Sequence, residues 1–109
     1  MMKRERDHFA FGIRFEDRRA AERYQELKIE EAKGKIQVLK TRVKFPLIPD
    51  QKDEQGKIVE RRIDYLADFT YFTKRGEFVV EDTRGIRTPE DRLKKALMYY
   101  MHKIRITEV

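Results

Sequence analysis

Two aspartates in the second half of the chain are spaced so that they can face each other across a β-hairpin. Residues 63–72 and 78–83 are rich in apolar, aromatic and β-branched residues, which predicts two strands. Residues 74–76, Lys-Arg-Gly, are typical of a three-residue hairpin loop with glycine at the left-handed position. This loop sets a register in which Asp68 lies directly opposite Asp82. Because like charges at opposed positions repel, the pair indicates a cation between them.

Carboxylate oxygens from two aspartates suit a hard divalent cation, Mg²⁺ or Mn²⁺, with water and substrate phosphate as the other ligands. Strand alternation places Arg84 on the same face as Asp82, two residues further on. We therefore expect metal-assisted phosphodiester hydrolysis, in which the metal activates water and Arg84 stabilises the developing charge. The same residues also allow a purely structural interpretation, in which Asp68 pairs with one of the many arginines.

A helix is predicted before these strands. Asp17 is a suitable N-cap and Gly34 a suitable residue just after the C-terminus. The helix between them has an apolar stripe that includes Ala20, Tyr24 and Leu27. Glu31 continues this stripe, and Ala21 and Lys28 lie beside it.

The segment that precedes the helix alternates apolar and polar residues. Residues 8–15 are therefore predicted to form a short strand or an extended arm, with Phe9, Phe11, Ile13 and Phe15 on one face. We assign residues 1–16 to this N-terminal arm and residues 1–109 to a single domain.

The last helix has the clearest boundary signals. Thr88 is its predicted cap, Pro89 its first residue, and the acidic Glu90 and Asp91 lie in its first turn. Its predicted core-facing stripe consists of Leu93, Ala96, Leu97, Tyr100 and Met101. With strands at 36–47, 58–72, 78–83 and 104–109, the order is helix, three strands, helix, strand. This order predicts an α/β (α+β) fold with a mixed sheet and a helical crossover.

The composition favours a polyanionic partner. The chain has a net charge of +6 and an isoelectric point near 9.6, which favours nucleic acid first and an anionic membrane surface second. It has no cysteine, so disulfides and thiolate sites are excluded. No apolar run has the length of a membrane span and no signal peptide is recognisable, so we expect an intracellular, cytoplasmic protein.

Basic residues cluster near the start of the last helix and could contact DNA phosphates beside the acid pair. They are Arg84, Arg87, Arg92, Lys94 and Lys95. A second candidate patch on the first helix consists of Arg18, Arg19 and Arg23. The alternative is that both groups simply form solvated helix faces.

Three segments together resemble a known family. They read FEDRRAAERYQELK, YLADFTYF and FVVEDTRGIRT. In this order they are similar to the small phage Holliday-junction-resolvase-like proteins with the PD-(D/E)XK nuclease fold, over nearly the whole chain. The resemblance implies a restriction-endonuclease-like core and a divalent-metal-dependent endonuclease that acts on branched DNA in recombination, as a homodimer without a small-molecule cofactor.

The resemblance also implies roles for single residues. Asp68 and Asp82 match the family's metal-binding acids, and the backbone carbonyl of Thr83 would be a further ligand. Glu81, on the other face, would be a structural or salt-bridged neighbour. The turn and cap after the motif match Gly85 and Thr88.

Two positions depart from the family pattern. The motif lysine is Arg84, which stays charged and can bind phosphate but cannot exchange a proton with the attacking water. Ala20 stands where the first helix of the family has a glutamate. Asp17, one turn earlier, could replace that ligand, and Glu22 is a poorer substitute. These departures define the alternative function: a catalytically degenerate nuclease-fold protein that binds DNA or a host protein without cleavage.

Overall fold

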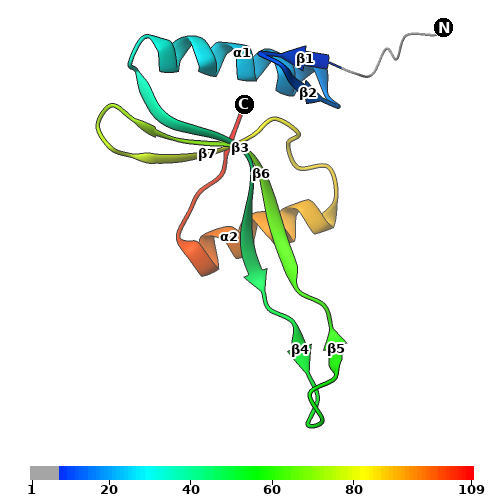
Figure 1. Ribbon diagram of the computed structural model, residues 1–109. Helices are drawn as coiled ribbons and strands as arrows, with labels where there is room; N and C mark the ends of the chain where they lie inside the picture. Colours follow the sequence, from blue (N-terminus) through cyan, green and yellow to red (C-terminus); the bar gives the residue numbers. More distant parts are fainter. Residues whose placement is uncertain (1–7) are drawn as a thin grey trace, which may run out of the picture.

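The computed structural model describes residues 8–109, so residues 1–7 of the expected N-terminal arm lie outside the described part (Figure 1). Two helices and eight strands follow one another along residues 8–109. They are β1 (His8–Ala10), β2 (Ile13–Phe15), α1 (Arg18–Ala32), β3 (Ile36–Ile48), β4 (Gln51–Lys52), β5 (Ile58–Glu60), β6 (Ile63–Thr73), β7 (Phe78–Asp82), α2 (Pro89–His102) and β8 (Thr107–Glu108).

The main sheet has four strands in the order β3-β6-β7-β8. The pairs β3–β6 and β6–β7 are antiparallel, whereas β7 and β8 are parallel and are connected through α2. The predicted α+β class and mixed sheet are therefore confirmed. The last strand is shorter than expected, because only Thr107 and Glu108 pair with β7. The expected strand over 58–72 is divided into β5 and β6 by Arg61 and Arg62.

The predicted hairpin register is confirmed between β6 and β7. The amide of Thr73 donates to the carbonyl of Glu77 at 2.8 Å, and Thr70 pairs with Val80. Gly76 has a φ of 90°, the left-handed conformation that a three-residue loop requires. This loop is the local reason why the two acidic positions further along the strands come to face each other.

The first helix packs as its sequence predicts. Asp17 caps α1, and its side chain accepts from the amide of Arg19 at 2.9 Å. The buried residues of α1 contact the part of β6 nearest the hairpin turn, where Phe69 and Tyr71 complete the core. The buried helix residues are Ala20, Ala21, Tyr24 and Leu27.

The N-terminal segment differs from the expected single face. It folds into the β1–β2 hairpin, with positive φ at Phe11 and Gly12 in the turn. This turn reverses the chain and breaks the alternation. Phe15 is consequently buried, whereas Phe9 and Phe11 are exposed, so the prediction that these side chains share one face was wrong.

The last helix also differs from its predicted packing. The capping box of Thr88 and Asp91 is confirmed. However, Met98 is the only fully buried residue of α2, and Leu93, Tyr100 and Met101 of the predicted stripe are exposed. The reason is that the sheet beneath α2 is narrow: Met98 packs with Tyr65, Ala67 and other residues in a small second core.

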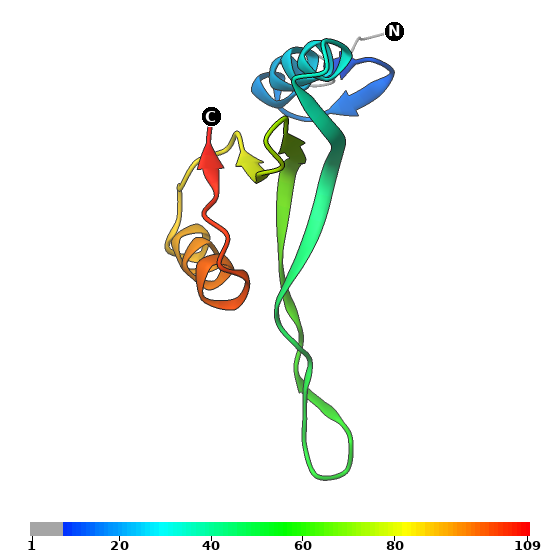
Figure 2. The ribbon, with the colours of Figure 1, turned by 90° about the vertical axis from the view of Figure 1, so that its left-hand side faces the viewer.

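A long two-stranded arm projects from the body of the molecule (Figures 1 and 2). Strands β3 and β6 run beyond the core and lead to β4 and β5, which pair with each other. The radius of gyration is 16.7 Å, whereas a compact domain of this length has about 13 Å. No helix in the described part of the chain is long and apolar enough to span a membrane.

Candidate functional site

The two predicted acids lie beside each other at the end of the β6–β7 hairpin. Phe69 of β6 pairs with Glu81 of β7. One residue further from the hairpin turn, Asp68 on β6 therefore lies opposite Asp82 on β7. The Nε atom of Arg84 lies 3.1 Å from Oδ1 of Asp82 and 3.8 Å from Oδ2 of Asp68. The structure thus brings together the three residues that the sequence placed on one face.

Asp82 has a full set of hydrogen bonds. Its Oδ1 accepts from the amide of Arg84 at 2.7 Å, and its Oδ2 accepts from the hydroxyl of Tyr65 at 2.9 Å. The Nη2 atom of Arg84 donates to the same Oδ2 at 3.3 Å. Burial alone would raise the pKa of Asp82, but the hydrogen bonds from Arg84 and Tyr65 outweigh it and lower the pKa below its ordinary value.

Asp68 receives both of its hydrogen bonds from Thr83, and Arg84 lies at ion-pair distance. Its Oδ2 accepts from the amide of Thr83 at 2.7 Å and from the Thr83 hydroxyl at 2.9 Å. Burial nevertheless dominates and raises the pKa of Asp68, although Thr83 and Arg84 oppose the change. The two aspartates therefore differ: Asp82 is stabilised as an anion, whereas Asp68 is a weaker acid than usual. This contrast is typical of two carboxyl groups that share one site.

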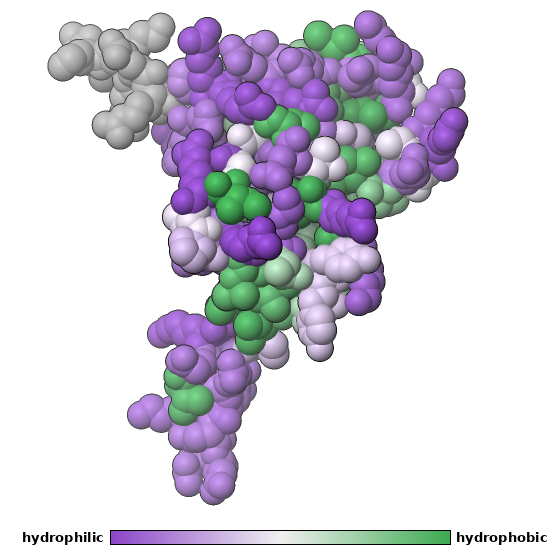
Figure 3. Space-filling model, turned by 180° about the vertical axis from the view of Figure 1, so that it is seen from behind, coloured by the Kyte–Doolittle hydropathy of each residue, from purple (hydrophilic) through white to green (hydrophobic). Residues whose placement is uncertain are grey.

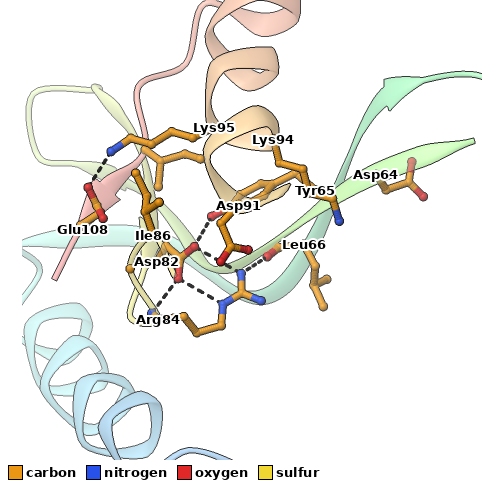
Figure 4. Close-up of a pocket in the computed structure, with 12 residues that line it drawn as sticks. Asp64, Tyr65, Leu66, Asp82, Arg84, Ile86, Asp91, Lys94, Lys95 and Glu108 are labelled. Atoms are coloured by element: carbon orange, nitrogen blue, oxygen red, sulfur yellow. Dashed lines mark hydrogen bonds and ion pairs between the residues drawn. The ribbon is translucent and has the colours of Figure 1, made fainter. Parts of the chain in front are cut away.

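Arg84 is fixed by more than the acids. Its Nη2 donates to the carbonyl of Leu66 at 2.8 Å, and the carbonyl of Arg84 accepts from Nε of Arg87 at 3.0 Å. Figure 4 shows the guanidinium between Asp82 and Leu66, below the first turns of α2. The side chain nevertheless remains 44% exposed, so part of it is accessible from solvent.

A small hollow of about 100 Å³ lies beside this cluster, between β6, β7 and α2 (Figure 4). Asp82 and Arg84 form part of its wall, and Lys94 and Lys95 line the side made by α2. The Nζ of Lys95 is 2.6 Å from Oε2 of Glu108. Both acidic and basic side chains therefore line this hollow, which lies directly beside Asp82 and Arg84.

Residues 6–109 match a protein family described as "Protein of unknown function (DUF1064)". The chain belongs to this family. No curated protein and no solved structure matches the chain significantly. The match covers both helices and every strand of the main sheet, so the site described above lies wholly inside the DUF1064 region.

Glu81 has the structural role expected for it in this DUF1064 protein. It is 1% exposed and forms a two-pronged ion pair with Arg23 of α1, at 2.8 Å and 2.7 Å. The hydroxyl of Tyr71 also donates to Glu81. The ion pair connects α1 to β7, the strand that also carries Asp82.

The candidate replacements for the missing helix glutamate do not join the acid pair. Among residues 8–109 no group of three acidic, histidine or cysteine side chains could together hold a metal ion. Asp17 is used as the cap of α1, and Ala20 is buried in the core. Glu22 pairs with Arg18 at 3.2 Å and lines a separate hollow beside Thr83. Glu22, which sequence reasoning ranked as the poorer substitute, therefore shares a hollow with Thr83 but bonds to Arg18 and not to the acid pair.

The donor set fits a hard cation in kind, because Asp68 and Asp82 offer carboxylate oxygens. Arg84 lies against both acids, so a bound ion would require its guanidinium to move aside. Its partial exposure permits such a movement. Asp68, Asp82 and the carbonyl of Thr83 are the groups that would hold the ion.

The predicted DNA-binding residues form one group near the hollow and the start of α2 and a second group on α1. Arg87, Lys94 and Lys95 lie at or near the hollow, although Lys94 also pairs with Glu90 at 3.3 Å. Arg92 is exposed on the first turn of α2. On the first helix Arg18 pairs with Glu22, and Arg19 donates to the C-terminal residue Val109 at 2.9 Å.

Tyr65 is a site residue that sequence reasoning missed. Simple alternation places Tyr65 and Asp68 on opposite faces of β6. Tyr65 and Ala67 pack in the α2 core, yet Phe69, of the same parity, packs in the α1 core, so the strand twists strongly in between. Burial raises the pKa of Tyr65, and its proton remains on the phenol to bond Asp82.

Proposed function

We propose that this DUF1064 protein is a divalent-metal-dependent endonuclease that hydrolyses phosphodiester bonds of branched DNA, in the manner of a Holliday-junction resolvase. One observation carries the proposal: the carboxylates of Asp68 and Asp82 converge on one point at the end of a hairpin, where Arg84 offers a positive charge. The resemblance of the motif around these residues to the PD-(D/E)XK nucleases supports the same interpretation.

Each residue of the site has a distinct role in this proposal. Asp68 and Asp82, with the carbonyl of Thr83, would hold Mg²⁺ or Mn²⁺, which supplies activation of water and polarisation of the phosphoryl oxygen. Arg84 binds a non-bridging phosphate oxygen and stabilises the charge that develops on it. Tyr65 and Thr83 orient the two carboxylates through the hydrogen bonds described above.

The basic residues of the last helix would bind the DNA backbone on either side of the cut. Arg87 and Arg92 are exposed at the start of α2, and Lys94 and Lys95 line the hollow. Such contacts position the duplex and give salt-dependent affinity without reading its sequence. The net charge of +6 supports a nucleic-acid partner inside the cell.

Branched DNA requires paired cuts, so the active form in this proposal is a homodimer with two equivalent sites. A four-way junction has approximate two-fold symmetry, which a symmetric dimer can match.

A second function is favoured by one specific observation. The guanidinium of Arg84 neutralises both acids, and the first helix offers a buried Ala20 where the nuclease pattern has a glutamate. A degenerate nuclease that binds DNA or a host protein without cleavage would have this arrangement. In that case Arg84 would be a permanent structural replacement for the metal ion.

A cleavage assay separates the two functions. The protein is incubated with a labelled four-way junction or with a linear duplex of the same sequence, with Mg²⁺, Mn²⁺ or EDTA. The endonuclease predicts metal-dependent cuts in the junction that both Asp68→Asn and Asp82→Asn abolish. Tight junction binding without cleavage under any of these metals would refute the endonuclease and support the degenerate binding protein.

A further inference from the structure

The projecting arm exposes apolar side chains that the body of the protein does not cover. The arm consists of residues 49–62, between β3 and β6, and contains β4 and β5. Ile58 is 45% exposed and Val59 is 56% exposed, and Ile63 at the base is 38% exposed. Figure 3 shows a small apolar patch on an otherwise hydrophilic arm.

The arm is preformed despite its few contacts with the body. Gln51 pairs with Glu60, and Lys52 pairs with Ile58. The side chain of Asp53 accepts from the amides of Gln55 and Lys57 at 2.9 Å and 3.0 Å and fixes the turn at the tip. An isolated two-stranded hairpin is only marginally stable in water. A hairpin that is ordered and apolar but uncovered gains stability when it packs on another surface.

A matching apolar groove lies where the arm joins the body. It is formed by the end of β3, the C-terminal end of α2 and the base of the arm. Its apolar lining residues include Pro46, Leu47, Ile48 and Met101, and Asp50, Lys52 and Arg62 of the arm lie at its edge with His102. The nearby Tyr100 is 72% exposed and Met101 is 48% exposed. His102 is held against β3 by a 2.7 Å contact between its Nε2 and the carbonyl of Pro46. The groove is therefore a fixed surface.

The charge of the arm favours a protein occupant over nucleic acid, because it offers no net attraction to phosphate. The arm carries four basic and four acidic residues, so it is neutral in a chain with a net charge of +6. The basic residues are Lys52, Lys57, Arg61 and Arg62, and the acidic residues are Asp50, Asp53, Glu54 and Glu60. A neutral arm can approach a second basic copy without repulsion, and its acidic tip suits the basic Lys103 and Arg105 that follow α2.

The dimensions suit a reciprocal exchange between two copies. From Pro49 to Gln55 the arm spans at most about 20 Å at about 3.3 Å per residue. When two arms lie antiparallel about a two-fold axis, the tip of each reaches the base of the other, where the groove lies. The 14 residues of the arm and those of the groove together reach the roughly 20 residues per side of a standard stable interface.

We propose that this protein forms a two-fold symmetric homodimer in which the arm of each copy packs in the groove between β3 and α2 of its partner. Ile58 and Val59 are the buried anchors on the arm, Met101 is their counterpart in the groove, and the exposed Tyr100 lies next to it along α2. The proposal gives a location to the dimer assumed for the endonuclease, but it does not depend on catalysis.

The test begins with the oligomeric state. Light scattering coupled to size exclusion should give the mass of a dimer at micromolar concentration. Val59→Asp and Met101→Asp each place a charge in the interface and should weaken the dimer by about 30-fold or more. Lys74→Asp, at the exposed β6–β7 turn, is the matched control and should leave the dimer intact. Circular dichroism checks that each variant is folded.

Cross-linking then locates the interface, because the chain has no cysteine of its own. A Val59→Cys chain is mixed with a differently tagged Met101→Cys chain and treated with a short bismaleimide. The proposal predicts a cross-linked heterodimer, whereas Val59→Cys mixed with Lys74→Cys should give none. A monomeric wild-type protein, or a dimer that neither Asp variant weakens, would overturn the proposal. Neither measurement uses DNA or metal, so the dimer can be confirmed or refuted whether or not the protein cleaves DNA.

Discussion

The Nε atom of Arg84 lies 3.1 Å from Oδ1 of Asp82, on the side where Asp68 is also within ion-pair distance. One guanidinium therefore reduces the repulsion between two carboxylates. A divalent cation would need the same oxygens. Arg84 and the metal ion consequently compete, and this competition can be measured without any DNA substrate.

Replacement of Arg84 by alanine should strengthen metal binding. Without the guanidinium the two carboxylates repel, so Arg84→Ala should have a lower Tm than the wild type in EDTA. Saturating Mg²⁺ or Mn²⁺ should then raise the Tm of Arg84→Ala more than that of the wild type, because a metal at 100 times its Kd stabilises by about 2.7 kcal/mol. Arg92→Ala, an exposed arginine of α2, is the control. Equal metal effects on all three proteins would contradict the competition.

Replacement of Arg84 by lysine should increase cleavage. Lysine keeps a positive charge beside the phosphate but can also exchange a proton with the attacking water, which arginine cannot do. Proton transfer by a positioned side chain contributes about 100-fold or more. We expect Arg84→Lys to raise the single-turnover rate on a four-way junction by up to about 100-fold. Arg84→Lys combined with Asp68→Asn should remain inactive, and a lower rate for Arg84→Lys alone would count against this role.

The buried ion pair behind the site should be important for stability. Arg23→Ala leaves the fully buried Glu81 without its cation, which typically costs about 3–5 kcal/mol. Arg18→Ala is the matched control on the same helix, because the exposed Arg18–Glu22 pair is worth only about 0.3–0.5 kcal/mol. Urea denaturation gives both values. A loss below about 1 kcal/mol for Arg23→Ala would show that the pair does not anchor α1.

Stability should decline at alkaline pH because of Tyr71. Burial, together with the hydrogen bond to Glu81, raises the pKa of Tyr71 to about 12 from its ordinary value of 10.0. Between these values the unfolded chain loses a proton that the folded chain retains, so the free energy of unfolding falls as the pH rises from about 10 to about 12. Tyr71→Phe should remove this part of the decline. An unchanged pH dependence in Tyr71→Phe would contradict the assignment.

The local elements could be predicted because their signals lie within a few residues of each other. Asp17 and Thr88 cap helices by contacts to the next turn, and Gly76 fixes the hairpin that aligns Asp68 with Asp82. Alternation also predicted the side on which Arg84 lies, although β7 ends at Asp82 and Arg84 is held there by its bonds to Asp82. These features depend on backbone geometry that a short segment determines by itself.

The remaining features depend on tertiary structure. The twist of β6 brings Tyr65 to Asp82, although alternation separates their faces, and no local pattern encodes the extent of that twist. The stripe of α2 has an amphipathic period, but the narrow sheet buries only Met98 and leaves Leu93 and Tyr100 exposed. The turn at Phe11 and Gly12 likewise converted one expected strand into a hairpin.

The most direct test of the central claim is the anomalous scattering of Mn²⁺ in crystals of the protein. The account predicts a strong anomalous peak within coordination distance of carboxylate oxygens from both Asp68 and Asp82, with the Arg84 guanidinium displaced from its position between them. The same experiment on Asp82→Asn should give no peak. If the wild-type crystals show Arg84 still paired with both acids and no peak at saturating Mn²⁺, the site does not bind metal and the proposed endonuclease is contradicted.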